Sequence, residues 1–166
     1  MIQTVAPFSI SRIFNAPCEL LFKVNTEVEH LQNWMSPEGF KTIHAAMDFR
    51  VGGTYHYGLE GPNGMQMWGK QVFRDIIPDE RLTFIQSFSD ENGELARHPM
   101  SATWPLEMLA VTTFEKIEDA TTKVTITWQP WNSDQEGNAT FDAARSGMEQ
   151  GFSGTFAKLD SYLRTM

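Results

Sequence analysis

The residues that could carry chemistry in this chain are few and scattered. Glu107 lies among apolar residues just after Trp104-Pro105, and a carboxyl group buried there would have a raised pKa and could exchange protons. His98 lies in a long segment without regular patterning, and Cys18 lies in the first turn of a predicted helix. An alternating strand favours an outward-pointing Glu107, and no base accompanies Cys18. The sequence therefore predicts no catalytic residue.

The four histidines do not have the spacing of metal ligands. His30, His44, His56 and His98 never pair three or four residues apart, and no HExxH motif or Cys/His cluster occurs. Gly52-Gly53 is not followed by a predicted helix, so it does not resemble a dinucleotide-binding fingerprint. The sequence therefore predicts neither a metal site nor a cofactor.

An aromatic stripe follows this double glycine. Strand alternation places Tyr55 and Tyr57 on one face and turns His56 away from them. For any single residue, ordinary core packing is the favoured interpretation. The excess of Trp and Met nevertheless favours an adaptable cavity for a small apolar or aromatic ligand, because Met adjusts its shape and Trp and Tyr carry polar atoms. The expected cavity residues are Trp34, Phe40, Tyr55, Tyr57, Trp68, Phe84, Trp104, Met108, Trp128, Met148 and Phe152.

Length and charge limit the classes of protein to which this chain can belong. The chain has 166 residues, which suits a single domain over 1–166. A net charge of −8 argues against nucleic acid and anionic membranes as partners. One cysteine favours a reducing compartment, and neither a leader-like start nor an apolar run of about 20 residues occurs. We expect a cytoplasmic protein that does not enter a membrane.

Periodicity then predicts the elements that position these residues. We expect a first strand at 5–14, two short helices or one broken helix over 18–35, and one long helix over 139–165. Gly147, Gly151 and Gly154 in that helix each cost about 1 kcal/mol relative to Ala, so close packing or open space must compensate. Further strands are expected at 42–50, 53–60, 65–77, 81–89, 106–118 and 122–131.

This order of elements predicts an α+β helix-grip fold. Short connections favour an antiparallel meander, and a curved sheet of about seven strands wrapped around the long C-terminal helix buries that helix's apolar stripe. The exception is the segment 90–105, which is too long for a hairpin. We expect it to gate the cavity, with Trp104 as the lid residue.

Several motifs in this order resemble a known superfamily. They are Asn15-Ala16-Pro17, Trp34-Met35-Ser36-Pro37-Glu38-Gly39-Phe40, Arg50-Val51-Gly52-Gly53, Pro78-Asp79-Glu80-Arg81-Leu82, Trp104-Pro105-Leu106-Glu107-Met108-Leu109 and Met148-Glu149-Gln150-Gly151-Phe152-Ser153-Gly154-Thr155. Together they are similar to the START/birch-pollen-allergen-like (SRPBCC) superfamily, in the branch named for homology to the activator of the heat-shock protein 90 ATPase. The resemblance covers about residues 8–164 and implies a helix-grip fold with an internal cavity. It departs at Phe152, where a bacterial subgroup often has tryptophan.

Function is less constrained, because members of this superfamily bind lipids, hormones or polyketides, cyclise polyketides, or assist chaperones. The missing acid–base constellation favours a binding protein for a small apolar or aromatic molecule. One alternative is a polyketide cyclase- or hydrolase-like enzyme that uses Glu107, His98 or a tyrosine. Another is a chaperone-associated stress-response protein. The sequence leaves open a homodimer and a chaperone as partners.

Overall fold

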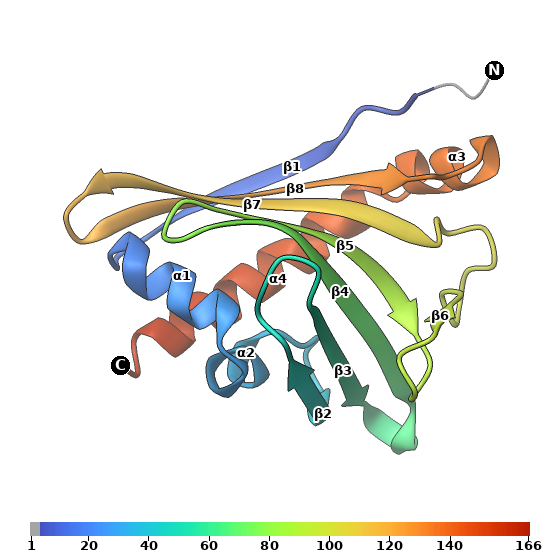
Figure 1. Ribbon diagram of the computed structural model, residues 1–166, viewed down its shortest axis with the longest axis horizontal. Helices are drawn as coiled ribbons and strands as arrows, with labels where there is room; N and C mark the ends of the chain where they lie inside the picture. The colour runs from blue at the N-terminus through green and yellow to red at the C-terminus, as the bar shows by residue number, and fades with distance from the viewer. Residues whose placement is uncertain (1–3) are drawn as a thin grey trace.

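A curved antiparallel sheet dominates the computed structural model, which describes residues 4–166 (Figure 1). The strand order is β1-β8-β7-β5-β4-β3-β2, with the short β6 paired to β5. All pairings are antiparallel. The strands are β1 (Phe8–Phe14), β2 (Lys41–Met47), β3 (Thr54–Glu60), β4 (Gln66–Ile77), β5 (Arg81–Ser89), β6 (Leu95–Ala96), β7 (Glu107–Glu118) and β8 (Thr121–Trp131).

Alternation of side chains gives the sheet one buried face. In β7 the residues Met108, Ala110, Thr112 and Phe114 are buried, and their neighbours in the strand are more exposed. Such a period of two places every second side chain on the same face. In β7 the face turned toward the helices is therefore the more deeply buried one.

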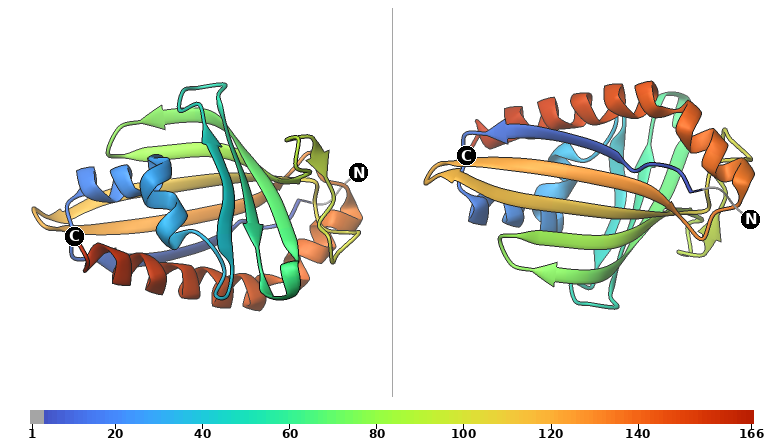
Figure 2. Two further views of the ribbon diagram at one scale, coloured as in Figure 1. Left: turned by 90° about the horizontal axis from the view of Figure 1, so that it is seen from below. Right: turned by 90° about the horizontal axis from the view of Figure 1, so that it is seen from above.

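Helices cover the concave face of the sheet. The short α1 (Cys18–Thr26) and α2 (Val28–Trp34) follow β1, as the sequence predicts. Glu27 separates them in an extended conformation, and the indole N–H of Trp34 donates to the Val24 carbonyl oxygen at 3.0 Å. The views from below and above show α4 running along the curved sheet, with α1 and α2 nearby (Figure 2). This arrangement confirms the predicted α+β helix-grip architecture.

The predicted long helix is divided into two. The helix α3 (Gln135–Ala143) begins before the predicted start, and α4 (Arg145–Leu163) follows after a break at Ala144. The Asp134 side chain caps α3 by accepting a hydrogen bond from the Gly137 N–H at 2.7 Å. The break lets α3 bury Phe141 at one end of the sheet while α4 takes its own direction along it.

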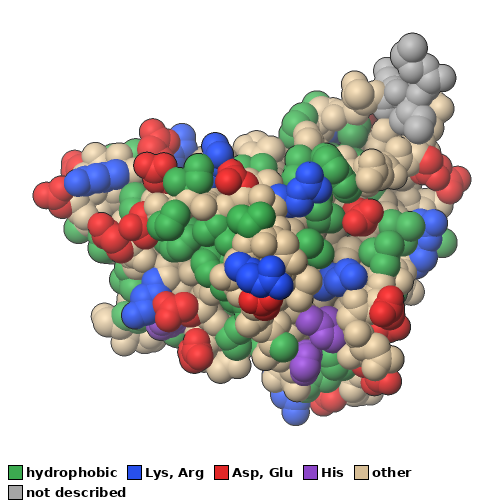
Figure 3. Space-filling view, viewed as in Figure 1, with side chains coloured by type: hydrophobic (Ala, Val, Ile, Leu, Met, Phe, Trp, Pro, Cys, Tyr) green, Lys and Arg blue, Asp and Glu red, His purple; other side chains and the backbone are tan. Residues whose placement is uncertain are grey.

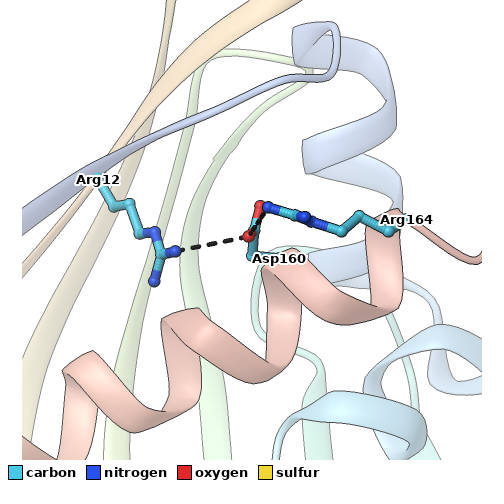
Figure 4. A network of polar contacts seen from close by, with 3 residues as sticks. All are labelled: Arg12, Asp160 and Arg164. Carbon is cyan, nitrogen blue, oxygen red and sulfur yellow. Dashed lines mark hydrogen bonds and ion pairs between the residues drawn. The ribbon is translucent and has the colours of Figure 1, made fainter.

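Polar contacts fix α4 against its neighbours. Arg12 of β1 and Arg164, the residue just after α4, both approach the same carboxylate oxygen of Asp160 in α4, at 3.5 and 2.9 Å (Figure 4). Near its C-terminal end, the Tyr162 hydroxyl lies 2.7 Å from His30 Nδ1 of α2. Lys158 Nζ donates to the carbonyl oxygen of Ser36 at 2.6 Å. These contacts fix the position of α4 relative to β1 and the segment after α2.

Candidate functional site

A pocket of about 390 Å³ lies between the concave face of the sheet and α4. This volume falls at the lower end of the range of about 300–1,000 Å³ that is typical of small-molecule sites. Its walls come from β3, β4, β5, β7 and β8 on one side and from α4 on the other. Asn25 of α1, Trp34 of α2, the segment after α2 and the segment 97–105 complete the lining.

Most of the aromatic and methionine residues expected at a cavity lie around this pocket. Those that line it are Trp34, Tyr55, Tyr57, Trp68, Phe84, Trp104, Met108, Trp128 and Phe152. The Trp128 and Phe152 rings meet edge to face, with centroids 4.9 Å apart. Aromatic walls of this kind suit flat apolar molecules.

Two of the expected residues lie elsewhere, and one has a mixed position. Phe40 packs closely over Gly61 near the start of β2 and does not line the pocket. Met148 packs in a small core cluster with Phe8, Met108 and Phe141, and borders an outer groove instead. Trp68 contributes to the lining, although its ring also stacks on His56 with centroids 5.4 Å apart.

The two tyrosines of β3 differ in their hydrogen bonding. The Gln86 side-chain amide donates to Tyr57 Oη at 2.7 Å, and the Tyr57 ring covers Gly69, where a Cβ would lie 2.4 Å from the hydroxyl oxygen. Burial raises the pKa of Tyr57, although the bond from Gln86 acts in the opposite direction. Burial, followed by the nearby Tyr57, raises the pKa of Tyr55. Both phenols are therefore neutral over the physiological range.

Polar residues that the sequence-based prediction missed also line the pocket. Gln71 of β4 and Thr112 of β7 are 5% and 6% exposed, and neither side chain hydrogen-bonds to another group in residues 4–166. The register pairs Gln71 with Tyr55 on one side and with Gln86 on the other. The signal in the sequence was strand alternation, which places Gln71 on the same face of β4 as Gly69 and Phe73.

The two candidate acid–base residues have different positions. His98 lines the pocket, its ring lies 4.5 Å from that of Phe88 between centroids, and its Nδ1 accepts the Met100 N–H at 3.0 Å. Burial lowers the pKa of His98, and a bonded acceptor Nδ1 requires the neutral ring with its hydrogen on Nε2. Glu107 is not part of the lining, because the next residue, Met108, faces inward.

Among residues 4–166, no formally charged side chain lines the pocket. The described walls include no Asp, Glu, Lys or Arg, and their polar groups are amides, hydroxyls, indoles and the His98 ring. Trp104 lies 6.1 Å from both His98 and Phe141, measured between ring centroids, so part of the segment 90–105 packs on α3. The gating role of this segment stays a prediction.

Histidines also gather on the outer face of the sheet, near the β2–β3 edge (Figure 3). The rings of His44 and His56 lie 4.9 Å apart, and His56 Nε2 lies 3.1 Å from the carbonyl oxygen of Asp90. Within residues 4–166, no three His, Cys, Asp or Glu side chains are placed to hold a metal ion. Over the same residues, no helix has both the length and the apolar character needed to cross a membrane.

The architecture and the position of the pocket define a helix-grip domain with a hollow beneath its long helix. The family model of Activator of Hsp90 ATPase homolog 1-like proteins matches residues 15–164. The chain therefore belongs to this family. No curated protein matches the chain.

Solved structures share this fold at low sequence identity. A protein from Arthrobacter aurescens is 25% identical, with a TM-score of 0.76 over 96% of this chain and 87% of its own. A protein from Rhodobacter sphaeroides is 17% identical, with a TM-score of 0.77 over 100% and 99% of the two chains. The AHSA1 protein from Silicibacter pomeroyi is 15% identical, with a TM-score of 0.72 over 96% and 99%. These similarities support the fold.

Proposed function

We propose that this protein binds a small, uncharged, mostly apolar or aromatic molecule in the pocket between the sheet and α4. The observation that carries the proposal is a pocket of about 390 Å³ with aromatic walls and no formally charged lining residue. A concave, largely apolar space with a few polar groups is the usual form of a small-molecule site. The single cysteine suits a reducing compartment, so we place this activity in the cytoplasm.

A blocking variant tests the proposal. Thr155 of α4 lines the pocket and also borders the outer groove, and a tryptophan at this position would occupy part of the pocket. Ala157 borders only the outer groove, so ligands that bind in the pocket should still shift Ala157→Trp. Ser153 lies two residues away on the same helix, is exposed and lines neither the pocket nor the outer groove. Ser153→Trp is therefore a matched control that adds the same side chain outside the pocket.

The experiment is a thermal-shift screen of neutral aromatic compounds. A ligand that binds only the folded state raises the melting temperature, by an amount that grows with its concentration relative to Kd. We expect compounds that stabilise the wild type and Ser153→Trp but leave Thr155→Trp unshifted. If no neutral aromatic compound shifts the wild type, or if every hit also shifts Thr155→Trp, the pocket is not the binding site and the proposal is wrong.

A further inference from the structure

Four polar residues with little exposed surface line the pocket without a side-chain hydrogen bond. They are Tyr55, Gln71, Ser87 and Thr112, which are 3%, 5%, 6% and 6% exposed. Within residues 4–166, no hydrogen bond is made by their hydroxyl or amide groups. Within residues 4–166, no fully buried side-chain nitrogen or oxygen lacks a hydrogen-bond partner, so the free polar atoms of these residues are open to the pocket. Polar groups in a protein interior are normally paired, and a polar atom that is open to the pocket can take its partner from a molecule bound there.

The sheet register brings two of these groups together. Tyr55 of β3 and Gln71 of β4 are directly opposed, and Gln71 is in turn opposed to Gln86 of β5. Opposed side chains in an antiparallel pair have Cβ atoms about 4.5–5.5 Å apart. The Gln86 amide donates a hydrogen bond to Tyr57, whereas Tyr55 and Gln71 have no such bond. Tyr55 and Gln71 are the two groups without a partner that the register places directly opposite each other.

The chemistry of this pair favours an uncharged ligand group. Gln71 offers two amide hydrogens and a carbonyl oxygen, and Tyr55 offers a hydroxyl that can donate or accept. No lining residue supplies a formal counter-charge, so a carboxylate or an ammonium would be buried unpaired. A hydroxyl or a carbonyl can instead satisfy both side chains at once. Phe84 and Trp128, also in the lining, provide apolar surface for the rest of the molecule.

We propose that Tyr55 and Gln71 bind a hydroxyl or carbonyl group on the buried end of a neutral aromatic ligand. This inference rests on the proposed binding function and adds to it the class of ligand and the two residues that recognise its polar end. The Tyr57–Gln86 pair beside them is already satisfied and holds its part of the wall in place.

The test uses three probes of one shape and four proteins. The probes are 2-hydroxyfluorene, 2-methylfluorene and fluorene-2-carboxylate, which differ in the group at one ring position. The proteins are the wild type, Tyr55→Phe, Gln71→Leu and Gln32→Leu, where Gln32 is an exposed glutamine on α2 outside the pocket. Isothermal titration calorimetry gives Kd for each pair, and Thr155→Trp shows whether binding occurs in the pocket.

We expect 2-hydroxyfluorene to lose its relative advantage in the two pocket variants. The ratio of the methyl Kd to the hydroxyl Kd should fall about 3- to 10-fold in Tyr55→Phe and Gln71→Leu, and should not change in Gln32→Leu. Comparing ratios cancels the general effect of each mutation on apolar binding. Fluorene-2-carboxylate should bind the wild type at least about tenfold more weakly than 2-hydroxyfluorene.

The outcomes separate this inference from the proposed function. If both neutral fluorenes bind in the pocket with a ratio that is the same in all four proteins, the pocket binds aromatic molecules but Tyr55 and Gln71 do not recognise a polar group. Tight binding of the carboxylate would refute the requirement for a neutral ligand. If no fluorene binds the wild type, this inference is overturned, and the proposed function is overturned with it only if the thermal-shift screen also finds no neutral aromatic ligand.

Discussion

Replacing Gln71 with leucine should stabilise the free protein. Gln71 is 5% exposed and its amide has no hydrogen-bond partner in residues 4–166. The lower limit for a polar group that is left unpaired in a protein interior is about 1 kcal/mol, and this limit applies because the Gln71 amide is open to the pocket. Leucine has a similar size and no polar atoms, so Gln71→Leu should raise the free energy of unfolding by up to about 1 kcal/mol. For a chain of this length, each kcal/mol raises Tm by about 2–4 °C, so the expected rise is up to about 2–4 °C.

The neighbouring glutamine supplies the matched control. Gln86 is opposed to Gln71 in the sheet and also lines the pocket, but its amide donates to Tyr57 Oη at 2.7 Å. Gln86→Leu removes that bond and leaves the Tyr57 hydroxyl without its donor. The free energy of unfolding of Gln86→Leu should therefore fall by about 0.5–1.5 kcal/mol.

Urea unfolding followed by circular dichroism measures both variants. The midpoint should move to higher urea for Gln71→Leu and to lower urea for Gln86→Leu, with the slope m unchanged in each. A loss of stability in Gln71→Leu as large as that in Gln86→Leu would contradict the reasoning. It would mean that the Gln71 amide supports the fold, and the assignment of its hydrogen bonds to a ligand would lose its basis.

Two further predictions concern glycines and pH. Gly154→Ala should raise the free energy of unfolding by about 0.5–1 kcal/mol in urea titrations, because an added Cβ meets nothing within 4 Å. Gly69→Ala should lower the free energy of unfolding by about 1–3 kcal/mol, because the added Cβ would displace Tyr57. Equal effects of the two substitutions would refute this prediction. The lowered pKa of His98 means that the unfolded chain takes up its proton first, so the contribution of His98 to stability is complete above pH about 6.5 and is lost as pH falls below that value. In His98→Asn the new side chain can still accept the Met100 N–H but does not titrate. This variant should therefore lose the part of the pH dependence of the urea midpoint, between pH 5 and 8, that His98 causes. An unaltered pH dependence would exclude His98 as its source.

The regular elements were largely predictable from the sequence, because their signals are local. Strand alternation and turn residues lie within a few residues of the elements they define. The expected strand at 81–89 has the same bounds as β5, and the expected strand at 106–118 differs from β7 by one residue. The break at Ala144 was not predicted, because the apolar pattern continues across it and the direction of each helix depends on packing.

The sequence by itself determined an α+β chain with a curved antiparallel sheet, a C-terminal helical region and an inward-facing pair, Tyr55 and Tyr57, since a strand of known phase fixes the face of each side chain. Only the tertiary structure decided that Gln86 bonds to Tyr57 while Gln71 has no partner. Two glutamines in inward-facing positions look alike in the sequence. Their roles differ because hydrogen bonds depend on register and on distances between strands, which no local pattern specifies.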